Sequence, residues 1–188
     1  LNIIEIETER LTRLIDDLLT LSDIESNKLS FSNKEDIEIN EAMTEIIHMM
    51  DEIAKQKNLK FTYKIEKDLP KVYGNRDWFK QMILNLIDNA IKYTHEGGSV
   101  RVLTYKKDDN ICISIKDTGI GIPEKDIPRL FERFYRVDKA RSRRVGGTGL
   151  GLAIVKHIVI SFNGEIEINS EEGKGTEFLV KIPFKPFL

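Results

Sequence analysis

The stretch GGTGLGLAIVKHIVISF, residues 146–162, decides the fold more than any other part of the chain. Its glycines run directly into an apolar segment, which predicts a helix over residues 150–162. The first N–H groups of a helix have no partner within the helix, and the helix dipole favours an anion at that end. Glycine lets such groups approach a phosphate without an intervening Cβ. We therefore expect this loop to bind phosphate.

Two familiar glycine loops do not fit this stretch. A dinucleotide-binding GxGxxG loop follows a strand, whereas GTGLGL follows a basic segment, and the motif GxxxxGK(S/T) is absent. Nine of the twelve glycines fall between residues 119 and 175, mostly in DTGIGI, GGTGLG and EGKGT. This clustering indicates that the backbone approaches a ligand closely at several loops.

The pattern on either side predicts an α/β two-layer sandwich, a mixed sheet packed on three helices. Besides the helix at 150–162, helices are expected at 40–57, opened by Asn40, and at 76–94. Strands are expected at 35–39, 59–65, 99–106, 110–117, 165–170 and 176–184, the last two joined by a turn at EEGKG.

One long amphipathic helix is expected to precede this sandwich, over residues 1–26. Its apolar positions recur at spacings near three and four and are Ile4, Leu11, Leu14, Ile15, Leu18 and Leu21. The stripe is wide and has no partner of similar length, so a subunit or a further helix should cover it; packing on its own domain is the alternative. The polar segment NKLSFSN predicts a linker, with a domain boundary within residues 26–34.

Composition limits the possible functions of the chain. Its 188 residues, 40% hydrophobic and 32% charged, suit one main domain with a small appendage. The net charge of −2 gives no basic field for nucleic acid, and one cysteine with three histidines falls short of a structural zinc site. No apolar run is long enough to span a bilayer. Residue 1 is leucine, so we expect a fragment of a longer protein.

Asp117 ends the alternating strand NICISIKD. Alternation places it on the same face as Ile111, Ile113 and Ile115, so the carboxylate is predicted to point into the core. A buried carboxylate is costly unless donors reach it. The exocyclic amine of an adenine in an apolar slot is one such donor, and capping of the following turn is the alternative.

Three polar residues share one face of the predicted helix at 76–94. Asn85, Asn89 and Lys92 lie at i, i+4 and i+7 on an otherwise apolar helix. Neutral amides and a lysine suit a hydrated Mg²⁺ that bridges phosphates, with one amide oxygen as a ligand. A solvated helix face is the alternative.

In this order the motifs resemble the catalytic ATP-binding domain of bacterial sensor histidine kinases, within the superfamily of gyrase, heat-shock chaperone and mismatch-repair ATPases. NLIDNAIKY resembles the N box, FERFYR the F box, and DTGIGI, GGTGLGLAIVK and GKGT the three glycine boxes. The resemblance covers residues 35–184, and ERLTRLIDDLLTLSDIE resembles the second helix of the family's dimerisation and phosphoacceptor hairpin. It implies a hairpin helix and linker at 1–30 and a catalytic domain at 31–188. The first hairpin helix, with its S-H-E-x-R-T-P motif, is expected outside this sequence.

The same resemblance implies ATP and Mg²⁺ as cofactors and assigns the site. Asn89 is the implied metal ligand, Asn85 and Lys92 lie near the phosphates, Tyr93 lies against the nucleotide, and Asp117 accepts from the adenine amine. The other implied nucleotide-binding residues are Gly119, Gly121, Gly147, Thr148, Gly149, Leu150, Gly151 and Thr176.

The resemblance also implies a lid over the triphosphate, from about Arg136 to Thr148. The basic segment RFYRVDKARSRRVGG, at 133–147, lies in and just before this lid. We expect some of its cations to reach the phosphates and take Arg133 as the catalytic candidate with Asn85 and Lys92. For any one of these cations taken alone, a solvated lid charge is the favoured role. The charged residues of the segment and its neighbour are Glu132, Arg133, Arg136, Asp138, Lys139, Arg141, Arg143 and Arg144.

One residue type favours a kinase over a hydrolase. In the superfamily's ATPases a glutamate one helical turn before the metal-binding asparagine activates water, and that position here is Asn85. An amide cannot take a proton, so water attack lacks its general base. We expect a protein histidine kinase; a chaperone- or gyrase-type ATPase and a degenerate nucleotide-binding module are the alternatives.

The resemblance further implies the setting of the intact protein. The expected partners are a response-regulator receiver domain, whose aspartate receives the phosphoryl group, and a second copy joined through the hairpin helices. The domain is expected in the cytoplasm, with a membrane anchor only outside this sequence. His95 lies in a predicted turn, and His48 and His157 lie inside predicted helices, so none of them is expected to be the phosphoacceptor.

Overall fold

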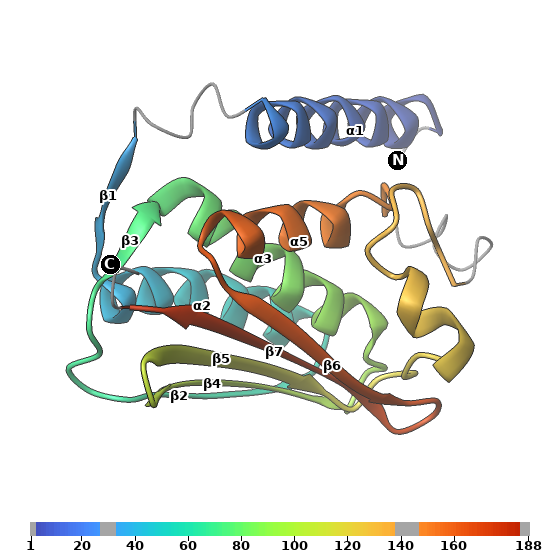
Figure 1. Ribbon diagram of the computed structural model, residues 1–188. Helices are drawn as coiled ribbons and strands as arrows, with labels where there is room; N and C mark the ends of the chain where they lie inside the picture. Colours follow the sequence, from blue (N-terminus) through green and yellow to red (C-terminus); the bar gives the residue numbers. More distant parts are fainter. Residues whose placement is uncertain (1–2, 27–32, 138–146, 185–188) are drawn as a thin grey trace.

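A mixed five-stranded sheet forms one layer of the computed structural model, which describes residues 3–26, 33–137 and 147–184 (Figure 1). The strand order is β2-β4-β5-β7-β6, with β2 parallel to β4 and the other neighbours antiparallel. The strands are β2 (Lys60–Ile65), β4 (Ser99–Lys107), β5 (Asn110–Asp117), β6 (Glu165–Glu171) and β7 (Gly175–Pro183). The predicted terminal hairpin is β6–β7.

Three helices cover one face of this sheet: α2 (Ile39–Gln56), α3 (Arg76–Tyr93) and α5 (Gly151–Ser161) (Figure 1). Inward-facing residues of β5 and β7 pair across the sheet, so the alternation seen in the sequence becomes a continuous apolar floor. Above it, the ring of Phe79 is fully buried and meets Phe162 edge-on, with centroids 6.2 Å apart. The predicted sandwich of one mixed sheet and three helices is confirmed.

A second sheet has two strands and joins β1 (Lys34–Ile37) to β3 (Val72–Asn75). β1 corresponds to the strand expected at 35–39, whereas β3 was not predicted. β3 is short and contains Gly74, so it carries little strand signal. The glycine is required because a Cβ there would lie 2.2 Å from the Phe162 ring. β3 leads directly into α3, where the Asn75 side chain accepts a hydrogen bond of 3.0 Å from the Trp78 amide. This cap fixes where the site-bearing helix begins.

One local prediction was wrong. Asn40 does not open α2, which starts one residue earlier with Glu38 at the N-cap position. The Asn40 amide instead donates to the Glu66 carbonyl at 2.7 Å and accepts from the Leu69 amide at 3.1 Å, so it fastens the segment after β2. The segment after β5, which begins with DTGIGI, continues into a 3₁₀ helix, η1 (Glu124–Arg129).

The N-terminal helix α1 (Ile3–Glu25) lies across α5, on the side away from the sheet (Figure 1). Near its C-terminal end Leu21 and Ile24 are buried, whereas Leu11 and Ile15 are more than half exposed. Packing on its own domain, the alternative, is therefore found at the C-terminal end of the helix. Cover of the exposed part by a subunit or a further helix stays a prediction. The predicted linker centre, residues 27–32, lies outside the described residues, and no helix in the described ranges is long and apolar enough to cross a membrane.

Candidate functional site

A cavity of about 500 Å³ opens between α3, the start of α5, the segment after β5 and the overlying helix α1. Most of the predicted site residues line it, although they come from distant parts of the chain. These residues are Asn85, Asn89, Lys92, Tyr93, Asp117, Gly121, Gly147, Thr148, Gly149, Gly151 and Thr176. Two further predicted residues, Gly119 and Leu150, support the cavity through their backbone amides, as described below.

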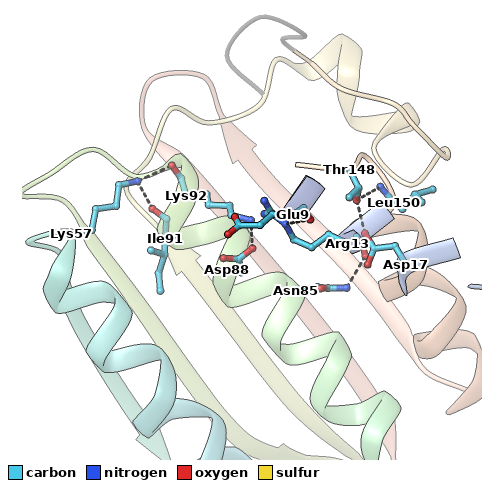
Figure 2. Close-up of polar contacts among 11 residues, drawn as sticks. Glu9, Arg13, Asp17, Lys57, Asn85, Asp88, Ile91, Lys92, Thr148 and Leu150 are labelled. Atoms are coloured by element: carbon cyan, nitrogen blue, oxygen red, sulfur yellow. Dashed lines mark hydrogen bonds and ion pairs between the residues drawn. The ribbon is translucent and has the colours of Figure 1, made fainter. Parts of the chain in front are cut away.

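The polar face of α3 forms one wall. Asn85 donates to the Gly151 carbonyl at 3.3 Å, which ties α3 to the start of α5, and Lys92 pairs with Asp88 at 2.5 Å (Figure 2). Among the described residues, none hydrogen-bonds to the side chain of Asn89. An amide that lines a cavity without a protein partner keeps its oxygen available to a ligand.

Lys57 holds the end of this wall. Its ammonium donates to the carbonyls of Ile91 at 2.6 Å and Lys92 at 2.8 Å (Figure 2). The last carbonyls of a helix have no partner within it, and a cation there also complements the helix dipole. Lys57, which the sequence analysis did not single out, therefore fixes the turn that presents Lys92 and Tyr93.

Asp117 forms the floor of the cavity and is buried, as its position in the strand predicts. Its Oδ1 accepts from the amides of Gly119 at 2.7 Å and Thr176 at 3.3 Å, and no described donor reaches Oδ2. Burial raises the pKa of Asp117 above its ordinary value, and the two amide bonds oppose this rise. One oxygen thus caps the turn, which was the alternative reading, and the other is left for a ligand.

Position 119 needs glycine because neighbouring atoms lie close to its Cα. A Cβ at this position would lie 2.5 Å from the Tyr93 carbonyl and 2.8 Å from Asp117 Oδ1. Any larger residue would push the carboxylate away from the amide that holds it. Gly119 thus supports the floor without lining it.

The glycine loop ends at α5 with the arrangement expected for an anion site. The Leu150 amide donates to Thr148 Oγ1 at 3.2 Å, and Gly149 adopts φ +78°. The Gly149 carbonyl accepts from the Phe134 amide at 2.9 Å, so the F-box segment is joined to the loop. A Cβ at Gly149 would lie 2.9 Å from Phe134 Cα. Position 149 therefore needs glycine both for its positive φ and for the close approach of Phe134.

The two described lid arginines lie in different places. Arg136 lines the cavity, whereas Arg133, our catalytic candidate, pairs with Glu25 of α1 at a separate small pocket. The remaining predicted lid charges, Asp138, Lys139, Arg141, Arg143 and Arg144, fall in residues 138–146, outside the described ranges.

Helix α1 contributes residues that the sequence analysis did not assign to the site. Arg13, Asp16 and Asp17 line the cavity, and Asp17 Oδ2 accepts a hydrogen bond of 2.5 Å from Thr148 Oγ1 (Figure 2). Burial raises the pKa of Asp17 above its ordinary value, and the hydrogen bond from Thr148 opposes the rise. Helical periodicity places these residues on one helix but carries no information about a contact 131 positions away.

Apolar side chains complete the slot above Asp117, and the sequence analysis did not assign them. Alternation along β7 places Phe178 on the same inward face as the isoleucines of β5, so this one residue had a readable signal. The apolar lining residues include Ile120, Ile122, Leu130, Leu152 and Phe178. Apolar side chains in a cavity that also holds the Asp117 carboxylate suit a purine base.

A mixed sheet under three helices, a carboxylate-floored slot, an amide-bearing helix and a glycine loop at a helix N-terminus together define a nucleotide-binding domain. Residues 74–186 match the family described as histidine kinase-, DNA gyrase B- and HSP90-like ATPase. The chain belongs to this family.

The chain is similar in sequence to named sensor kinases. It is 44% identical over 182 residues to the sensor histidine kinase WalK of Bacillus subtilis, covering 95% of this chain and 29% of that protein. It is 43% identical to a sensor protein kinase WalK of Staphylococcus aureus, covering 94% of this chain and 42% of that protein. The chain therefore spans less than half the length of these relatives.

Solved structures agree with the fold. The Acinetobacter baumannii histidine kinase AdeS superposes with a TM-score of 0.75 at 28% identity, over 95% of this chain and 81% of that one. Full-length ShkA, solved in complex with AMPPNP, gives 0.79 at 27% identity over 93% of this chain and 36% of that one. The nucleotide-free catalytic domain of the histidine kinase ThkA gives 0.71 at 27% identity over 82% of this chain and 99% of that one. The predicted family and fold class are confirmed.

Proposed function

We propose that this chain binds Mg²⁺-ATP and transfers the γ-phosphoryl group to a histidine on a hairpin helix, as the catalytic part of a sensor histidine kinase. The observation that carries the proposal is the cavity, whose lining includes both Asp117, with an oxygen that no described donor reaches, and the glycine loop at the start of α5. A nucleotide needs both features, an acceptor for its base and donors for its phosphates.

Asp117 is the proposed adenine reader. Its Oδ1 is already held by two backbone amides, so the carboxylate cannot rotate freely, and Oδ2 accepts from the exocyclic amine. A guanine presents a carbonyl at that position, which would face the carboxylate without a proton between them. The site is therefore expected to select ATP over GTP.

Asn89, Asn85 and Lys92 are the proposed phosphate and metal side of the site. The residues fit a divalent cation because Asn89 presents a hard oxygen that no described side chain uses. When bound, Mg²⁺ would neutralise charge on the phosphates. The backbone amides of the glycine loop orient the triphosphate, and Lys92 and Arg136 supply positive charge beside it. Arg133 would act there only after it leaves its ion pair with Glu25.

Asn85 directs the reaction to a kinase outcome. Its amide donates to the Gly151 carbonyl and has no basic group with which to take a proton from water. The γ-phosphorus–oxygen bond to ADP therefore breaks when an imidazole nitrogen forms the new bond to phosphorus, and ADP leaves with the electron pair. Positioning supplies most of the catalysis in such a transfer.

We further propose partners for the intact protein. The exposed apolar residues of α1 would pack in a dimeric helical bundle, because so many uncovered leucines and isoleucines on one helix are costly in water. A response-regulator receiver domain would take the phosphoryl group from the histidine. The domain would act in the cytoplasm, with any membrane anchor in segments outside this sequence.

Nucleotide binding and phosphate release by the 188-residue chain test the proposal. Titration calorimetry should show ATP binding that requires Mg²⁺, with much weaker binding of GTP. Steady phosphate release from bound ATP is expected to stay near background. Sustained release would favour a hydrolase, and absence of Mg²⁺-dependent binding would remove the proposal.

A further inference from the structure

Ser170 of β6 contacts two residues that line the proposed ATP site. Its Oγ accepts from the Ile122 amide at 2.9 Å and lies 2.8 Å from Thr176 Oγ1. The same hydroxyl lies 3.0 Å from the Gly175 carbonyl, to which it can donate. Ile122 and Thr176 line the cavity, whereas Ser170 does not. Ser170 can therefore influence a bound base only through these neighbours.

These contacts join three segments next to the Asp117 carboxylate. Ser170 and Thr176 lie directly opposite each other on β6 and β7, and Ile122 belongs to the segment after β5. The backbone amide of Thr176 donates to Asp117 Oδ1 at 3.3 Å. The hydroxyl of Ser170 thus contacts the residue that helps to hold the proposed adenine reader.

The number of hydroxyl protons fixes the direction of these bonds. A serine hydroxyl has one proton to donate and two lone pairs that can accept. If Ser170 donates to the Gly175 carbonyl, its lone pairs accept from the Ile122 amide and the Thr176 hydroxyl, and all three contacts are hydrogen bonds. If Ser170 donated to Thr176 instead, its contact with the Gly175 carbonyl would have no proton. The first arrangement is favoured because it satisfies every contact.

This direction leaves the Thr176 hydroxyl without a proton for a ligand. Its one proton is donated to Ser170, so towards the cavity the Thr176 oxygen can only accept. Asp117 Oδ2, which no described donor reaches, is also an acceptor. The exocyclic amine of adenine supplies protons to such groups, whereas the carbonyl of hypoxanthine or guanine would meet lone pairs alone.

We propose that Ser170 is a positioning residue for base selection, which holds the Thr176 hydroxyl as an acceptor so that the site rejects purines with a carbonyl at the six-position. The proposal rests on ATP binding in this cavity, as inferred above, and adds a residue that sets the base specificity of that site. Loss of the Ser170 hydroxyl frees the Thr176 proton. Thr176 can then donate to a six-position carbonyl, and the preference for adenine falls.

Titration of the 188-residue chain with Mg²⁺-ATP and Mg²⁺-ITP tests this proposal, because ITP carries a carbonyl where ATP has its exocyclic amine. Ser170→Ala is expected to lower the preference for ATP over ITP roughly fivefold, the change in affinity that one typical net hydrogen bond makes. Ser170→Cys has nearly the same shape but a weaker acceptor, so it should lower the preference in the same direction. Ser170→Thr keeps a hydroxyl and should keep the wild-type preference.

Ser114→Ala is the matched control for loss of a serine hydroxyl. Ser114 lies on β5 and donates to Glu177 of β7 at 2.6 Å, so it too links its strand to β7 through a side-chain contact. Neither Ser114 nor Glu177 lines the cavity. This variant should therefore keep the wild-type preference for ATP over ITP.

A double variant separates positioning from a merely structural role. Thr176→Val has no hydroxyl proton to release, so adding Ser170→Ala to it should leave the ATP-to-ITP preference unchanged. The proposal is overturned if Ser170→Ala and Ser170→Cys keep the wild-type preference, if Ser114→Ala or Ser170→Thr loses it equally, or if Ser170→Ala lowers it as much in the Thr176→Val background. Equal binding of ATP and ITP by the wild type would also overturn it. Failure of the wild type to bind Mg²⁺-ATP would instead refute the proposed function.

Discussion

Replacing Asp117 with asparagine is expected to separate nucleotide recognition from folding. Asparagine keeps an oxygen that can accept from the amides of Gly119 and Thr176, so the floor of the cavity retains its hydrogen bonds. The second carboxylate oxygen becomes an amide group that can place a donor against the donor of the adenine amine. A mispaired buried hydrogen bond costs about 1–3 kcal/mol, which is roughly 5- to 150-fold in Kd.

The same substitution weakens ATP binding but should not lower the stability of the nucleotide-free protein. The pKa of Asp117 lies above its ordinary value of 3.8, chiefly because burial disfavours the charged carboxylate. The native state therefore binds the proton more tightly than the unfolded chain, and the full cost of the buried charge is present above the raised pKa. The nucleotide-free Asp117→Asn variant should thus be at least as stable as wild type near neutral pH.

The difference in stability between Asp117→Asn and the wild type should depend on pH. As the pH falls through the raised pKa of Asp117 towards 3.8, protonation of the native carboxyl relieves the cost in the wild type. The stability advantage of Asp117→Asn is therefore largest near neutral pH and shrinks in acid. Urea unfolding at several pH values measures this trend, and Asp108→Asn, at the exposed turn between β4 and β5, serves as a control for loss of one charge.

Calorimetric titration with ATP and GTP completes the test. Wild type and Asp108→Asn should bind ATP alike and prefer it to GTP, whereas Asp117→Asn should lose most of this affinity. The reasoning is refuted if Asp117→Asn binds ATP as tightly as wild type, or if it loses binding only because it is unfolded.

Two further predictions concern α3. Asn89→Ala is expected to remove the Mg²⁺-dependent part of ATP binding, because it deletes the proposed metal-ligating amide oxygen from the cavity wall. Titrations with Mg²⁺ and with a chelator measure this effect, and unchanged metal dependence would contradict the assignment. Lys57→Met should lower the free energy of unfolding by about 1–3 kcal/mol and weaken ATP binding, because two helix-end carbonyls lose a charged donor. Denaturant unfolding and ATP titration check the second prediction, which fails if both quantities match wild type.

Much of the site could be predicted because it depends on local periodicity. Strand alternation placed Asp117 inward, and helical spacing gathered Asn85, Asn89 and Lys92 on one face of α3. The glycine loop before α5 was recognisable because glycine has few reasons to cluster beside a helix start. Each of these inferences needed only the sequence within one element and its adjoining turn.

The parts that could not be predicted depend on contacts between distant segments. No local pattern indicates that Asp17 meets Thr148, or that Glu25 engages Arg133 and leaves Arg136 beside the cavity. Asn40 shows the same limit, because its type favours an N-cap while the fold uses it to hold a segment 26 residues later.

Phosphotransfer to a separate hairpin tests the central claim most directly. The hairpin would carry the family's S-H-E motif and come from the intact protein, and it would be mixed with this chain and ATP labelled at the γ-phosphate. The account predicts acid-labile, base-stable label on the hairpin, formed slowly because the two parts are not linked. The chain alone should remain unlabelled, since His48 and His157 lie within α2 and α5 and His95 lies in the turn after α3. Label on the chain itself that disappears with His95→Ala, or an unlabelled hairpin beside a chain that binds Mg²⁺-ATP, would contradict the account.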